Sequence, residues 1–207
     1  MASRDPPLFL AAPFPNEPRG CDMTRTKILL LGSAVLLLLS PPVRAAEPQD
    51  CTLSCAFKNE EGQVFKFIDY HLSGGTRFRI DILNADRTTM AFGIYRKDTG
   101  TSWSLDPDTK KYTEKKLDPG TWDTVIETLF AREFQAQGKT GEVRVLDYPC
   151  DVYRQENNRW VTLSCVAQGL NIVLRSEIIR DGKTVEVMEA VKFVLEKPAD
   201  SLFEIPR

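Results

Sequence analysis

Cysteine and histidine are the residues of this 207-residue chain whose chemistry could define a site. Four cysteines follow residue 45, at Cys51, Cys55, Cys150 and Cys165, and His71 is the single histidine. One histidine excludes metal sites that need several histidine ligands. Cys51, Cys55 and His71 could still hold Cu(I), because soft thiolates select that ion. A CxxxC spacing without a following proline is nevertheless a weak redox or copper motif, so we expect no metal and no cofactor.

An even number of cysteines favours disulfides in an oxidising compartment. The Asn-Asn dipeptide at 157–158 separates two strand-like runs and fits a two-residue turn, since asparagine tolerates a positive φ. That turn pairs Cys150 with Cys165 at a Cα separation of ~5.5 Å or less, which a disulfide can span. We therefore predict a Cys150–Cys165 disulfide.

A second predicted disulfide, Cys51–Cys55, depends on the local backbone. In one extended strand the two residues would lie roughly 13 Å apart, at ~3.3 Å per residue, which is beyond the reach of a disulfide. A turn or a short helix would bring them together. We expect the Cys51–Cys55 disulfide only in that case.

Hydrolytic chemistry has one candidate constellation, in which Asp69 would orient His71 and Ser73 would be the nucleophile. These residues lie two apart on one predicted strand, whereas the members of a catalytic triad normally come from separate elements. The sequence also shows no Walker loop and no GxGxxG dinucleotide motif. We expect no catalytic residues and no enzymatic activity.

The first 45 residues contain the features of an export signal. An apolar run at 28–39 follows Arg25 and Lys27 and precedes Pro-Pro-Val-Arg-Ala-Ala, which is the pattern of a secretory signal peptide. We predict a signal peptide over 23–45 that is cleaved after Ala45. An uncleaved membrane anchor is the alternative, but the run is short for a bilayer, which needs roughly 20 residues.

Residues 1–22 contain five prolines and no apolar periodicity, and such a stretch does not pack. We expect Met23 to be the true start and 1–22 to be a disordered, non-native upstream extension. The remaining chain is then exported and soluble in the periplasm, and it does not span the membrane once the signal is removed. A net charge of −2 gives no basic patch by composition, so we expect no nucleic-acid partner.

Residues 46–207 show strand periodicity interrupted by one helical segment, and no repeat or linker divides them. Apolar and polar residues alternate over 76–83 and 90–94, which is typical of half-buried antiparallel strands. Over 118–138 the apolar spacing is helical, between an aspartate cap and a glycine stop, which predicts a helix of about five turns. An Asp-Gly pair at 181–182 predicts a tight hairpin. We expect one mostly antiparallel β domain of about nine strands, with this amphipathic helix covering one face.

Two segments resemble the LolA-like periplasmic lipoprotein-carrier superfamily. Trp103-Ser-Leu-Asp-Pro-Asp-Thr-Lys-Lys-Tyr112 is similar to its hairpin motif, and Pro198-Ala-Asp-Ser-Leu-Phe-Glu-Ile-Pro206 is similar to its closing strand. The similarity covers most of 60–206. It implies a curved, incomplete β-barrel with the helix on its concave face, where the carriers hold acyl chains. Four cysteines and a single long helix set this chain apart from the carriers.

This resemblance and the aromatic helix face predict an exported binding protein for an apolar or acyl-chain ligand, involved in lipid or lipoprotein handling at the cell envelope. The alternative is a structural or interaction protein of the envelope with a filled core, which would contact partners through its edge strands or its Arg77/Arg79 face. The predicted cavity is lined by apolar residues of the helix and of the strands expected to face it, namely Phe78, Ile80, Ile82, Met90, Phe92, Trp103, Trp122, Ile126, Phe130, Ile172 and Leu174.

Overall fold

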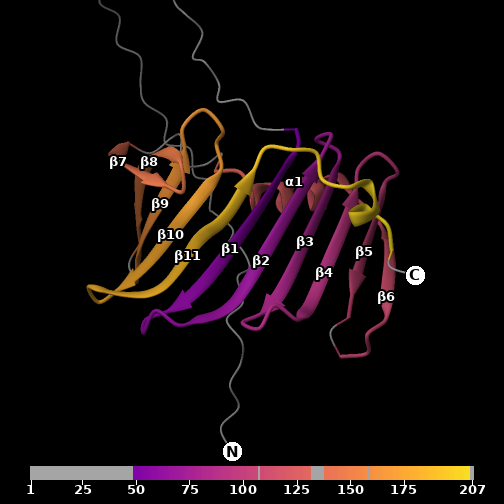
Figure 1. Cartoon of the computed structure of the whole chain (residues 1–207), viewed down its shortest axis with the longest axis horizontal. Coiled ribbons are helices and arrows are strands. Elements are labelled where there is room, and N and C mark those ends of the chain that lie inside the picture. The colour runs from indigo at the N-terminus through magenta and orange to yellow at the C-terminus, as the bar shows by residue number, and fades with distance from the viewer. Residues whose placement is uncertain (1–48, 107, 132–137, 158, 206–207) are drawn as a thin grey trace, which may run out of the picture. The chain divides into compact units, whose positions relative to one another are not determined.

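Eleven strands form a single open sheet in the computed structural model of this chain (Figure 1). The structure describes residues 49–106, 108–131, 138–157 and 159–205. All of these residues belong to one unit of the chain, Pro42–Arg207.

The strands follow one another as two meanders. The first consists of β1 (Cys51–Asn59), β2 (Val64–Ser73), β3 (Arg77–Asn84), β4 (Thr89–Arg96), β5 (Thr101–Leu105) and β6 (Tyr112–Lys116). The second consists of β7 (Lys139–Val145), β8 (Tyr148–Glu156), β9 (Val161–Ala167), β10 (Val173–Arg180) and β11 (Lys183–Val194).

Strand β1 pairs with β11 and joins the two meanders, so the order in the sheet is β6-β5-β4-β3-β2-β1-β11-β10-β9-β8-β7. Every pair of neighbouring strands is antiparallel. The end strands β6 and β7 do not pair with each other, so the described sheet stays open. The predicted fold class, an incomplete antiparallel sheet with one main helix, is confirmed.

Helix α1 (Pro119–Glu127) begins where the sequence predicts. The Asp118 side chain accepts a hydrogen bond of 2.9 Å from the Thr121 backbone N–H and caps the helix, and Pro119 suits the first turn because it lacks an N–H to satisfy. The helix ends at Glu127, so the predicted length of about five turns is wrong.

The chain leaves the helix because its next residues pair with the sheet. Phe130 forms an antiparallel bridge with Ile172, and the Ala131 N–H donates to the Asn171 carbonyl at 2.8 Å. This pairing satisfies backbone groups that a longer helix would satisfy internally. The rest of the predicted helix, at 132–137, lies outside the described residues.

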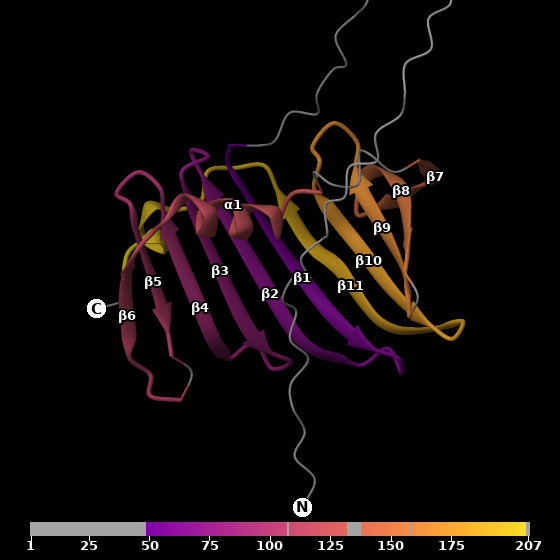
Figure 2. The ribbon, with the colours of Figure 1, turned by 180° about the vertical axis from the view of Figure 1, so that it is seen from behind.

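Different segments cover the two faces of the sheet. Helix α1 packs on one face, here called the α1 face (Figure 2), and the short 3₁₀ helix η2 (Asp200–Phe203) packs on the other, the η2 face (Figure 1). The larger core cluster lies on the α1 face and includes Trp122 and Ile126. A smaller cluster on the η2 face joins Phe203 to Phe92 and Ile94.

Candidate apolar ligand site

The predicted cavity residues do not all lie on one face of the sheet. Phe92 lies opposite the charged Asp81 in the register of β3 and β4, and it packs against the η2 helix. Trp103 lies opposite Ile94 and joins the same small cluster. Met90 alternates with Phe92 along β4 and is 40% exposed. The expectation that Met90, Phe92 and Trp103 face the helix is therefore wrong, because strand pairing turns that side of β4 and β5 to the η2 face.

Six other predicted residues form a filled core between α1 and the sheet. Each is at most 5% exposed, and all belong to the larger cluster. The six are Phe78, Trp122, Ile126, Phe130, Ile172 and Leu174. Their side chains contact one another, so these residues act as packing in this structure.

Beyond this core, a line of half-buried aliphatic side chains continues on the α1 face. Ile68, Ile80 and Ile82 come from β2 and β3, where Ile68 lies directly opposite Ile82. Met188 and Ile178 continue the line on β11 and β10, beyond the buried positions of β1. We call these five residues the apolar strip. Figure 2 shows α1 crossing the strands near one end, and no described helix covers the other end of this face.

Lys66 places a positive charge beside the apolar strip. Lys66 of β2 lies opposite Phe57 of β1, and its Nζ lies 4.4 Å from the centroid of the Phe57 ring and 5.3 Å from that of Phe65. The two rings meet edge to face, with centroids 6.4 Å apart. Lys66 forms no ion pair with a described residue, so its ammonium group is available to an anionic ligand.

The Arg77/Arg79 face is already occupied within the chain. Arg79 forms a bidentate pair with Asp81, with contacts of 2.6 to 3.0 Å, and donates to the Leu202 carbonyl at 2.8 Å. Arg77 pairs with Asp200 at 2.9 Å. The two guanidinium groups therefore hold the C-terminal segment against the sheet. Because both groups are engaged in this way, neither is free to make the predicted contacts with a partner.

The residues of the candidate triad make other contacts. Ser73 is fully buried, and its Oγ accepts a hydrogen bond of 3.2 Å from Arg77. His71 Nδ1 lies 3.2 Å from the Thr52 hydroxyl, and its Nε2 lies 3.8 Å from Asp81. Burial lowers the pKa of His71, against the opposing effect of the nearby carboxylates. The structure thus brings His71 to an internal polar network and not to the serine hydroxyl.

Cys51 and Cys55 both lie in β1, opposite Leu72 and Ile68 of β2. The strand is extended, so these cysteines are roughly 13 Å apart. This distance is beyond the reach of a disulfide, so the predicted Cys51–Cys55 disulfide is incompatible with the extended strand. Both are free thiols, and burial raises the pKa of each to about 12. Buried, protonated thiols of this kind pack as small apolar side chains.

Cys150 and Cys165 lie on neighbouring strands but are not directly opposite each other. Cys150 pairs with Ala167, and Cys165 pairs with Val152, so the register differs by two residues from the one predicted. Diagonal neighbours have Cα atoms ~7–8 Å apart, longer than a relaxed disulfide allows. Both are free thiols in this structure, and the predicted disulfide remains a prediction that requires these strands to move.

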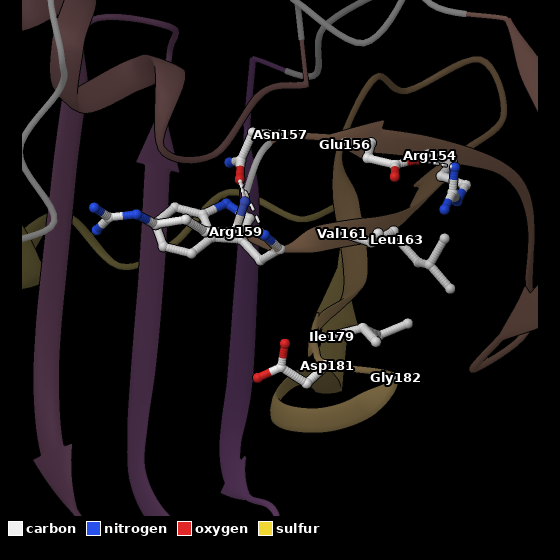
Figure 3. Close-up of a pocket in the computed structure, with 10 residues that line it drawn as sticks. Arg154, Glu156, Asn157, Arg159, Val161, Leu163, Ile179, Asp181 and Gly182 are labelled. Carbon is white, nitrogen blue, oxygen red and sulfur yellow. Dashed lines mark hydrogen bonds and ion pairs between the residues drawn. The ribbon is translucent and has the colours of Figure 1, made fainter.

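A pocket that the sequence did not indicate lies at the tips of two hairpins (Figure 3). Its volume is about 350 Å³. Asn157, Arg159 and Trp160 form its rim together with the 181–182 turn, and aliphatic groups of Val161, Leu163 and Ile179 line it. We call it the hairpin-tip pocket. The sequence shows both turns, but no pattern in it indicates that the turns meet.

No protein-family model and no curated protein matches the sequence. Solved structures do match the fold. The complex structure of Pseudomonas aeruginosa MucA/MucB is 14% identical, with a TM-score of 0.50, over 76% of this chain and 56% of that chain. A crystal structure of MucB is 11% identical, with a TM-score of 0.51, over 78% of this chain and 59% of that chain.

The chain thus spans little more than half the length of the MucB chains that it matches, and the likeness is one of fold. A LolA superfamily protein from Nitrosomonas europaea is also among the matches. It is 10% identical, with a TM-score of 0.34, over 78% of this chain and 93% of that chain.

The described part of the chain has no helix with the length and hydrophobicity of a membrane span.

Proposed function

We propose that this chain is an exported, non-enzymatic periplasmic protein that binds an apolar ligand, an acyl chain, along the apolar strip. The observation that carries the proposal is the line of partly buried aliphatic side chains that continues on the α1 face beside the buried core. A sheet face that meets water normally carries polar residues at such positions. Ile82 and Ile178 instead leave apolar surface there, which an acyl chain can cover.

The energetics favour an amphiphile over a plain hydrocarbon. Burying about ten methylenes contributes ~8 kcal/mol, at ~0.8 kcal/mol each, whereas association costs an estimated 4–15 kcal/mol. The acyl chain of the ligand by itself therefore gives only weak binding. An anionic head group beside Lys66 would add a charge pair at the edge of the strip, so we propose an anionic, single-chain lipid as the best ligand class.

Two further observations support this function. The 23–45 segment has the pattern of a signal peptide, which would deliver the chain to the periplasm. The segments at 103–112 and 198–206 resemble carriers of acylated lipoproteins, and the open sheet fits the curved, incomplete barrel that this resemblance implies.

The proposal is tested with a fluorescent fatty acid and the double variant Ile82→Thr/Ile178→Thr. Each substitution removes about 1 kcal/mol of apolar contact, so the probe should bind at least about tenfold more weakly. Val187→Thr is the matched control, because Val187 is also half-buried but lies on the η2 face, opposite Glu177. Lipid mass spectrometry of the purified protein should identify the natural ligand. Absence of both probe binding and co-purified lipid would reject the proposal.

An envelope interaction protein is the second candidate function. It is favoured by the filled core under α1, where Trp122 and Phe130 are each 5% exposed, and by the fold shared with MucB, a structure of which exists in complex with MucA(peri). In this case the apolar strip would bind a protein segment. Affinity capture from an envelope extract would then recover a protein whose binding Ile82→Thr/Ile178→Thr abolishes, with no lipid present.

A further inference from the structure

Two tyrosine hydroxyl groups on the α1 face lack a hydrogen-bond partner in the described chain. They belong to Tyr70 of β2, which is 7% exposed, and to Tyr95 of β4, which is partly buried. Buried polar groups in folded proteins are nearly always hydrogen-bonded, because an unpaired group gives up its water contacts without compensation. Burial raises the pKa of both phenols, so each stays protonated at neutral pH and can both donate and accept a hydrogen bond. These two hydroxyls are therefore groups that a ligand can satisfy.

Both tyrosines lie beside the apolar strip. A Cβ atom added at Gly93 would come within 2.9 Å of the Tyr95 hydroxyl oxygen, so the Tyr95 side chain lies along β4 over this glycine, where the missing Cβ leaves room for it. Gly93 lies opposite the strip residue Ile80, and Ile80 in turn lies opposite Tyr70. The Tyr95 hydroxyl and the Tyr70 side chain therefore flank Ile80 on its two sides.

The buried core holds the two phenol rings in place. Tyr70 and Tyr95 lie on the strands either side of Phe78, with ring centroids 6.2 and 6.3 Å from its centroid, and Phe78 is fully buried. The Cys55 thiol, which adds to the effect of burial on the Tyr70 pKa, lies opposite the strip residue Ile68. The phenols are thus fixed at the boundary between the core and the strip, which spares a ligand the cost of ordering them.

We propose that the acyl chain bound along the apolar strip carries a hydroxyl group, and that the phenols of Tyr70 and Tyr95 bind this group. The inference rests on the function proposed above and narrows its ligand class. Lys66 and Tyr70 lie four residues apart on the same face of β2 with Ile68 between them, a span of roughly 13 Å at ~3.3 Å per residue. An anionic head beside Lys66 therefore leaves the middle of the acyl chain beside the phenols. A hydroxyl there can accept a hydrogen bond from one phenol and donate one to the other.

The surroundings of the phenols favour a neutral oxygen over a second charged group. No described lysine or arginine alters the pKa of either phenol, so a charged group here would lose its water without gaining a counter-charge. An unsubstituted acyl chain would cover both hydroxyls without pairing them. A site that hydrogen-bonds a ligand hydroxyl discriminates against the analogue that lacks it, so the strip should prefer the hydroxylated chain.

Calorimetric titration of the intact chain with ricinoleic acid and oleic acid tests this inference, because the two fatty acids differ only by a hydroxyl group in the middle of the chain. We expect ricinoleic acid to bind at least about fivefold more tightly, the factor that one hydrogen bond contributes. Tyr70→Phe and Tyr95→Phe each remove only a hydroxyl, so each should weaken ricinoleic acid binding about fivefold and leave oleic acid binding unchanged. Tyr112→Phe is the matched control, because it removes the hydroxyl of a 44%-exposed tyrosine that packs against Phe92 on the η2 face.

Urea denaturation of the same variants separates ligand binding from a structural role. Tyr70→Phe and Tyr95→Phe should keep the midpoint of the parent protein, because no hydrogen bond within the described chain is lost, and a clear fall would contradict the inference. Equal binding of the two fatty acids by the parent protein, or an equal loss in Tyr112→Phe, would overturn it while the acyl-chain proposal stands. Failure of both fatty acids to bind would reject the proposed function and this inference with it. Hydroxylated acyl chains among the lipids that co-purify with the protein would support the inference.

Discussion

Replacing Trp122 by alanine tests whether the space under α1 is a filled core or a ligand cavity. Trp122 is 5% exposed and lies on the buried side of α1 together with Ile126. Removing a buried tryptophan costs about 3–5 kcal/mol through lost transfer energy and the cavity left behind. The substitution also removes a cation–ring contact with Lys97, whose Nζ lies 5.6 Å from the ring, worth ~0.5–1 kcal/mol when exposed. We expect the free energy of unfolding to fall by about 3–5 kcal/mol.

Urea denaturation followed by far-ultraviolet circular dichroism measures this loss without depending on tryptophan fluorescence. The midpoint should fall while the m-value stays constant, and the melting temperature should fall by roughly 6–20 °C, at about 2–4 °C per kcal/mol for a domain of this size. Trp103→Ala is the control, because Trp103 is only partly buried, on the η2 face. A loss below about 1 kcal/mol for Trp122→Ala, combined with loss of fatty-acid binding, would refute the packing argument.

Two further predictions concern the η2 face. Phe203 is 1% exposed and packs against Phe92, so Phe203→Ala should lower the free energy of unfolding, measured by urea denaturation, by about 3–5 kcal/mol. Ile205 is exposed, so the control Ile205→Ala should lower it little. Equal effects of the two substitutions would contradict the anchoring role of Phe203. Burial lowers the pKa of His71, so the unfolded chain binds this proton more readily than the folded chain. Stability should therefore be complete above pH 6.5 and fall as the pH drops through 6.5 toward the lower folded pKa, and His71→Gln should remove that slope. An NMR titration of this single histidine that gives a pKa at or above 6.5 would contradict the prediction.

Much of the local structure could be predicted from residue patterns. The start of α1 depends on Asp118 and Pro119, and the β10–β11 turn depends on Asp181 and Gly182, so both are encoded within a few residues of the feature itself. Alternation along β3 likewise indicates which of its side chains share a face. These features form because the groups that satisfy them are neighbours in the sequence.

The face on which each alternating set lies could not be predicted in the same way. Phe92 and Phe78 belong to equally regular apolar alternations, yet they lie on opposite faces because the β3–β4 register places Phe92 beside Asp81. The end of the chain then buries Phe92 under Phe203. An alternating sequence shows which side chains of a strand share a face, but it does not show which face of the sheet that is. A shift of one residue in the pairing register moves every side chain of the strand to the opposite face.

Long-range pairing also decided the end of the helix, the cysteine geometry and the hairpin-tip pocket. Phe130 leaves the helical pattern because Ile172, more than 40 residues later, offers a backbone partner. Cys150 and Cys165 lie on a diagonal because the connecting loop is longer than a two-residue turn. Arg159 and Asp181 line one pocket because two separate hairpins end side by side. By itself the sequence determined the strands, the turns and the start of the helix, whereas only the tertiary structure decided which of their side chains meet, because those contacts depend on registers set between segments far apart in the chain.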